Sequence, residues 1–332
     1  MLDERKSLIL RAVVEEYIES AEPVGSGRIA NAPAVSVSSA TVRNEMVALE
    51  RDGYLQQPHT SAGRVPTEKG YRYYVDTIEA VGDLATADSS KVQNFFDHAH
   101  GELERMLGDT SRLLAGLTDC AAVVLGPPYD AAVVRSVQLV SLAPRVVLLV
   151  VVLANGVVEK HTLELGAELT DDDVATVGPA LSAVVVNQPT DRRPPVPHGQ
   201  SSVLLEQALD AIYGGSSIDH DIDHVFVDGA SKVASAFDAV ETVREILGIL
   251  EEQLVVVSLI RDVMDRGLSV AIGTETGMLP LAECSLVVSP YEIDGRPEGT
   301  IGVLGPTRMD YPQALAAVAV VSQNLSHRLT EG

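Results

Sequence analysis

The spacing of apolar residues changes once along the chain, near Cys120. Before that point the apolar positions mostly recur every three to four residues, which predicts helices that bury one face. After it, short valine-rich segments alternate with turn signals such as Asn155-Gly156, which predicts strands with helical segments between them. We therefore predict an α+β multidomain chain in which helices come first and a mostly antiparallel sheet flanked by helices follows.

The first 85 residues carry the signals of helices and a hairpin. Asp3, Ser38 and Thr67 can each cap a helix, and the Glu22-Pro23 pair ends the first one because the residue before proline avoids helical geometry. The predicted elements are helices over residues 4–20, 26–31, 39–52 and 68–79, with strands at 54–57 and from Val65. Three helices followed by a two-stranded hairpin are the order of a winged helix-turn-helix, which we assign to residues 1–85.

The remainder contains a connecting helix and then the sheet. We assign residues 86–118 to a connecting helix, which Ser89 or Ser90 would cap and which would run to about Leu117. The predicted strands are 121–125, 133–140, 146–153, 157–163, 225–227, 268–272, 284–289 and 300–304. The predicted helices are 170–187, 201–213, 239–265 and 311–329. The helices between residues 166 and 224 interrupt the strands near their middle, which indicates an inserted helical segment.

The third predicted helix has the chemistry of a recognition helix. Val42, Met46 and Leu49 form its buried stripe, so Ala40 and Asn44 fall on the opposite face. Arginine pairs with guanine, asparagine with adenine and an alanine methyl with thymine, while serines and a helix N-terminus bind phosphate. The thin tip of the hairpin can lie along the DNA backbone or enter a minor groove. The residues that we expect to contact DNA are Ser38, Ser39, Ala40, Thr41, Arg43 and Asn44 on the helix and His59, Thr60, Ser61, Gly63 and Arg64 at the tip.

Charge permits DNA binding without arguing for it. The chain has a formal net charge of −23, whereas residues 1–80 hold 9 basic and 12 acidic side chains and a net charge of only −3. Most of the acidic excess thus lies outside the predicted DNA-binding domain, and no strong basic patch is visible.

The number of cysteines and the length of the apolar runs indicate the cellular compartment. Cys120 and Cys284 are too few for a disulfide framework, and no C-x-x-C unit offers a zinc or redox site. The longest apolar run, residues 146–154, has nine residues, whereas a membrane span needs about 20. The N-terminus lacks the apolar core of a signal peptide. These features predict a cytoplasmic protein with no membrane partner.

Three motifs carry a resemblance to a known family. They are residues 37–46 (VSSATVRNEM) with Gly53-Tyr54-Leu55, residues 57–67 (QPHTSAGRVPT) with Gly70-Tyr71-Arg72, and residues 301–311 (IGVLGPTRMDY). In these motifs the chain resembles the HrcA heat-inducible transcription repressors. The resemblance implies a GAF-like domain over residues 119–165 and 225–332, split by an inserted dimerisation domain over residues 166–224.

The same resemblance implies a regulatory role. The target would be an inverted-repeat operator upstream of chaperone operons, bound by a homodimer that places one recognition helix in each half-site. A GroEL-type chaperonin would hold the repressor active. Heat or chaperonin shortage would release it, because the population of a folded dimer depends on stability and concentration.

One other constellation suggests chemistry. The run from Asp219 to His224, with Asp228 beyond it, has residue types that bind zinc or manganese, although a polar loop before a strand explains it better. No phosphate-binding loop and no catalytic dyad are present. We therefore predict no cofactor and no enzymatic activity. Two alternatives stay open: a metal- or ligand-dependent enzyme carrying a winged-helix interaction module, and a small effector bound by the GAF-like domain.

Overall fold

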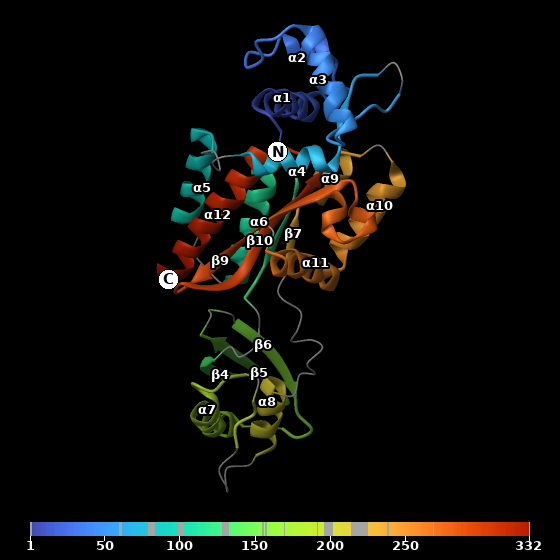
Figure 1. Cartoon of the computed structure of the whole chain (residues 1–332). Coiled ribbons are helices and arrows are strands. Elements are labelled where there is room, and N and C mark those ends of the chain that lie inside the picture. The colour runs from blue at the N-terminus through green and yellow to red at the C-terminus, as the bar shows by residue number, and fades with distance from the viewer. Residues whose placement is uncertain are drawn as a thin grey trace.

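The chain folds into three units in the computed structural model (Figure 1). The structure describes residues 2–59, 62–78, 84–98, 103–127, 133–154, 156, 158–168, 170–190, 192–195, 202–213, 225–237, 239–267 and 269–331. An N-terminal unit of helices and a hairpin lies above a central sheet covered by helices, and a smaller unit of three strands and two helices lies below. No helix in the described part of the chain is long and apolar enough to cross a membrane.

The N-terminal unit has the element order that the sequence predicts. Its elements are α1 (Glu4–Ser20), α2 (Ser26–Ala30), α3 (Ser39–Arg51), β1 (Leu55–Gln56), β2 (Val65–Pro66) and α4 (Glu68–Asp76), with β1 and β2 antiparallel. The side chains of Asp3, Ser38 and Thr67 each accept a backbone N–H in the first turn of α1, α3 and α4, as predicted. The apolar faces of these helices meet in one core that includes Ile9 and Met46.

The central unit is a five-stranded antiparallel sheet in the order β7-β3-β10-β9-β8. The strands are β3 (Ala121–Leu125), β7 (Val225–Asp228), β8 (Val270–Ile272), β9 (Cys284–Ile293) and β10 (Arg296–Pro306). Helices α6 (Leu103–Thr118) and α12 (Tyr311–Glu331) contact this sheet, and α5 (Thr86–His98) packs on α12. The remaining elements are α9 (Ala230–Ser235), α10 (Val240–Glu251), α11 (Gln253–Asp265) and the short 3-10 helices η1 (Gly273–Thr276) and η2 (Leu279–Leu281).

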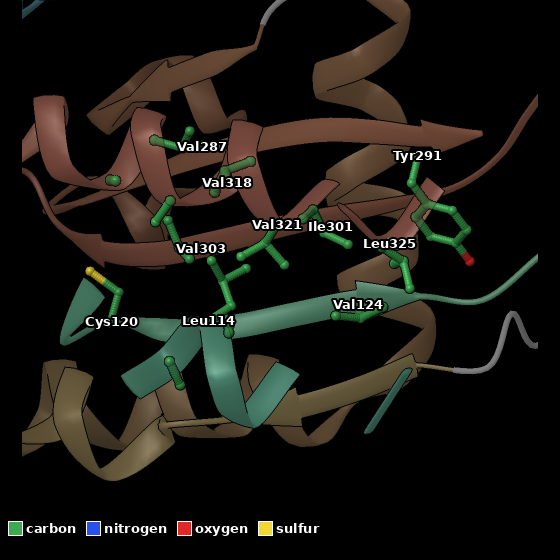
Figure 2. Packing of buried hydrophobic residues seen from close by; sticks show 14 of the residues in the cluster. Leu114, Cys120, Val124, Val287, Tyr291, Ile301, Val303, Val318, Val321 and Leu325 are labelled. Atoms are coloured by element: carbon green, nitrogen blue, oxygen red, sulfur yellow. The ribbon is translucent and has the colours of Figure 1, made fainter. Parts of the chain in front are cut away.

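Strand alternation divides the apolar side chains of the sheet between two cores. Val124 of β3 and Ile301 of β10 belong to the core that includes Leu114 of α6 and Val321 of α12 (Figure 2). Their neighbour Val123 packs instead in the core beneath α10 and α11. Successive strand residues point to opposite faces, so both faces of the sheet are covered by helices.

Two predicted long helices are each two helices in the structure. The helix predicted over residues 86–118 is α5 and α6, and Ser89 and Ser90 lie inside α5, where their hydroxyls donate to the carbonyls of Leu84 and Thr86 instead of capping it. The helix predicted over residues 239–265 is α10 and α11, separated by Glu252, whose backbone is extended. Apolar periodicity continued through both breaks, so it could not reveal them.

The lower unit is larger than the sequence predicts. It contains β4 (Val134–Ala143), β5 (Val146–Leu153), β6 (Val158–Glu164), α7 (Asp171–Val185) and α8 (Val203–Tyr213), and its strands form a sheet of their own in the order β4-β5-β6. Leu125, the last residue of β3, pairs with Val225, the first residue of β7. The central sheet therefore continues directly from residue 125 to residue 225. The predicted start of the insertion at residue 166 is too late, because residues 134–164 already belong to it.

Candidate nucleic-acid interface

The N-terminus of α3 is fixed by a small network of hydroxyl groups. Ser38 Oγ accepts the Thr41 N–H at 3.2 Å and lies 3.0 Å from Thr41 Oγ1. Ser39 Oγ lies 3.2 Å from Ser26 Oγ of α2, which ties the starts of the two helices together. The first turn of α3 therefore has a defined position relative to α2.

The face of α3 that the sequence assigns to DNA points away from the core. Val42, Met46 and Leu49 are buried, whereas Arg43 and Asn44 are exposed. The side chains of Ser38, Ser39 and Ala40 are also exposed, and Thr41 is half-buried. Within the described part of the chain, neither Arg43 nor Asn44 has a side-chain hydrogen bond or an ion pair, so their donors are free for another molecule.

The hairpin beside α3 is held at its base. Val24 and Arg64 form a two-way backbone bridge, with N···O distances of 2.8 and 2.9 Å, and Gln57 Nε2 donates to the Ala62 carbonyl at 2.9 Å. Gly63 lies so close to Val24 that a Cβ at this position would overlap the Val24 carbonyl. His59 is exposed near the tip. The predicted contacts Thr60 and Ser61 lie outside the described residues.

Arg64 is engaged within the protein, unlike the free tip residue that the sequence suggests. Its Nη2 and Nε donate to Glu50 Oε2 of α3 at 2.8 and 3.2 Å, and only 16% of its side chain is exposed. Glu50 is 33% exposed. The pair joins the base of the hairpin to α3. Sequence reasoning missed Glu50, because nothing in the local pattern shows that residues 14 apart meet.

A further cation near α3 was also missed. Lys69 of α4 donates to the Asp52 carbonyl at 2.8 Å, and its Nζ lies 4.2 Å from the centre of the Tyr54 ring. Arg51, in the last turn of α3, has a side chain that is 79% exposed. These residues add positive charge beside α3, although the unit as a whole is slightly acidic.

The residues weighed for other chemistry are the acidic run before β7, Asp228 and the two cysteines. The run from Asp219 to His224 lies outside the described residues, and the residues that the structure does describe contain no cluster of three or more potential metal ligands. Asp228 Oδ2 lies 3.8 Å from Arg112 Nε of α6. Burial raises the pKa of the Cys120 thiol to about 11 and that of Cys284 to about 12, which keeps both protonated at neutral pH and poorly nucleophilic.

Comparison with known proteins supplies what the geometry leaves open. A family model described as the HrcA protein C terminal domain matches residues 104–315. The chain is 35% identical over 343 residues to the heat-inducible transcription repressor HrcA of Pelotomaculum thermopropionicum, covering 99% of this chain and 97% of the relative. It is 39% identical over 344 residues to that of Acidothermus cellulolyticus, covering 100% of both.

A crystal structure of a hypothetical protein, determined at 2.2 Å resolution, has the same overall fold. It matches with a TM-score of 0.74 and 22% sequence identity, over 100% of this chain and 99% of that one. The full-length sequence matches confirm the resemblance carried by the three motifs, and the relatives are named as repressors, consistent with a protein that is not an enzyme. The chain therefore belongs to the HrcA family of heat-inducible transcription repressors.

Proposed function

We propose that the N-terminal unit is a winged helix-turn-helix that binds an inverted-repeat operator upstream of heat-shock chaperone operons. The observation that carries this proposal is the outward face of α3, where Arg43 and Asn44 are exposed and have no partner in the described part of the chain. An unpaired arginine and asparagine on an exposed helix face match the donors and acceptors of guanine and adenine in the major groove.

Each part of this surface has its own role in the proposal. Arg43, Asn44 and Ala40 contact base edges, while Ser38, Ser39 and Thr41 at the N-terminus of α3 face a phosphate. The hairpin tip, with His59, Thr60, Ser61 and Gly63, lies along the backbone or in the adjacent minor groove. Arg64 is held by Glu50 at the base of the hairpin, and we propose that it contacts a phosphate from that fixed position.

We further propose that the chain acts as a homodimer through the inserted unit, with the central unit as its GAF-like domain. In the insertion, β4 is an edge strand of its sheet, and it leaves Val140 and Leu142 exposed, the latter by 57%. An exposed apolar edge strand favours association with another copy. A two-fold dimer matches an inverted repeat because each half-site then receives one copy of α3.

Release on heat follows from linkage between folding and association. A modest loss of stability lowers the population of the dimer that can bind DNA, and a GroEL-type chaperonin restores it by refolding the chain. The cytoplasm is the compartment for this role, and no cofactor takes part in it.

Operator binding tests the proposal directly. Fluorescence anisotropy would be measured with an inverted repeat from upstream of a chaperone operon and with a scrambled duplex of equal length. The proposal expects binding to the repeat to be about 1,000-fold tighter, the lower end for specific binding proteins. It expects that binding to fall after heating and to recover with chaperonin and ATP. Equal affinity for both duplexes would refute the DNA-binding role, and affinity unaffected by heating would refute the release mechanism.

A further inference from the structure

Helix α4 joins the N-terminal unit to the central unit, and both of its attachments are specific. On one side it is fixed to the end of α3: Thr67 Oγ1 donates to the Gly53 carbonyl at 2.7 Å, and Lys69 Nζ donates to the Asp52 carbonyl at 2.8 Å. Gly70 lies against the Tyr54 carbonyl with no room for a side chain. The direction of α3 is therefore tied to that of α4.

On the other side, α4 holds a carboxylate against η1 of the central unit. Glu68 Oε1 accepts the Thr274 N–H at 3.0 Å, and Glu68 Oε2 accepts the Thr274 hydroxyl at 2.6 Å. Gly273 has a positive φ of 55° and lies where a Cβ would overlap the Glu68 carboxylate. The backbone of η1 is thus shaped to receive this side chain.

One turn later, Arg72 makes the second contact with the same region. Its guanidinium donates to both carboxylate oxygens of Glu275, with Nε to Oε1 at 3.0 Å, and its Nη2 also donates to the Val270 carbonyl at 2.8 Å. Glu275 Oε2 in turn accepts the Ile272 N–H at 2.9 Å. Burial alone would raise the pKa of Glu275, but the hydrogen bonds from Arg72 hold it below its ordinary value. Bidentate arginine–carboxylate pairs of this kind fix the relative orientation of the two groups as well as their distance.

Aromatic packing completes the contact. The rings of Tyr71 and Tyr74 lie 6.0 and 6.5 Å from the ring of Tyr311, at the start of α12, measured between centroids. Tyr311 is fully buried and its hydroxyl donates to the Thr307 carbonyl at 2.8 Å. We call the four polar side chains Glu68, Arg72, Thr274 and Glu275 the α4 latch.

We propose that the α4 latch sets the angle at which α3 projects from the central unit, and thereby determines which half-site spacing the dimer accepts. This inference rests on the proposed operator binding. A dimer gains affinity from its second half-site only if both copies of α3 face the DNA at the separation that the operator offers. Arg72 and Glu275 are positioning residues in this scheme, because they act on DNA through α4 and α3.

The test separates half-site binding from spacing. Anisotropy would be measured on a single half-site, on the full inverted repeat, and on repeats with the spacer changed by two and by five base pairs. Arg72→Ala and Glu275→Gln should leave the affinity for a single half-site within about twofold of that of the unmodified protein. The ratio of full-operator affinity to half-site affinity should fall about tenfold or more in both variants. Both variants should also bind the repeats with altered spacers better than the unmodified protein does. Arg105→Ala, which among the described residues removes only an exposed pair with Asp109 on α6, should change none of these.

Hydrogen exchange reports on the latch without DNA. The Thr274 N–H donates to Glu68, so Glu68→Ala, which removes the acceptor, and Arg72→Ala should accelerate its exchange, while Arg105→Ala should not. Unchanged spacing preference in both latch variants would overturn the proposal, as would tighter full-operator binding by Arg72→Ala, which would make the latch inhibitory. If the unmodified protein bound no half-site, the proposed function would fail, whereas slow Thr274 exchange would still show an intact latch.

Discussion

Gly63→Ala perturbs the hairpin at the point where it meets the rest of the N-terminal unit. A Cβ at this position overlaps the Val24 carbonyl, and the obstacle is backbone, which cannot rotate away as a side chain would. Relief requires the hairpin to move from Val24, which breaks the two backbone hydrogen bonds between Val24 and Arg64 at 2.8 and 2.9 Å. Each such bond contributes about 1 kcal/mol net, so the expected loss is about 2 kcal/mol of local stability.

Hydrogen exchange of the Val24 and Arg64 amides measures this loss. A decrease of about 2 kcal/mol in the opening free energy accelerates exchange about 30-fold. Gly27→Ala is the matched control: a Cβ there meets nothing within 4 Å, and alanine in α2 should stabilise it by about 0.5–1 kcal/mol. If the Val24 and Arg64 amides exchanged at the original rate in the Gly63→Ala variant, the bridge between them would not require glycine at position 63.

Three further predictions concern single contacts. Glu50→Gln should weaken operator binding about threefold or more, although it removes a negative charge near DNA. Adding Glu50→Gln to Arg64→Ala should weaken binding no further, because the two side chains act as one unit. Stronger operator binding by Glu50→Gln, measured by anisotropy, would contradict this. Ser38→Ala should cost about 1 kcal/mol at the start of α3, seen as faster exchange of the Thr41 amide, and an unchanged rate would exclude a capping role. Folding raises the pKa of Cys120 from 9.0 to about 11 and that of Cys284 to about 12, so both thiols should stabilise the fold fully below pH 9 and progressively less from pH 9 to 12. The measurement is the melting temperature against pH for the parent and for the Cys120→Ala and Cys284→Ala variants. The same decline in the variants as in the parent would contradict the prediction.

The N-terminal unit could be predicted almost completely from sequence because its signals are local. Caps at Asp3, Ser38 and Thr67, the break at Pro23 and the buried stripe of α3 each act within a few residues. The outward face of α3 followed from helix geometry alone. The partner of Arg64 did not, since an ion pair across the tertiary structure leaves no local pattern.

The insertion shows the same limit in the second half of the chain. The strands β4, β5 and β6 were predicted within a few residues, but their alternating valines are compatible with either sheet. Only the pairing of Leu125 with Val225 reveals that the segment between them is inserted into the central sheet and contributes no strand to it. The α4 latch was likewise invisible, because Arg72 and Glu275 are 203 residues apart.

The most direct test of the central claim is the base preference of Arg43→Ala and Asn44→Ala on the inverted repeat. Affinity would be measured for each variant against a set of operators with single base-pair substitutions in both half-sites. The account predicts that each variant loses about 1–3 kcal/mol on the original operator and no longer distinguishes the base pair at one position of each half-site. Unchanged affinity and unchanged preference in both variants would contradict the assignment of α3 as the helix that reads DNA.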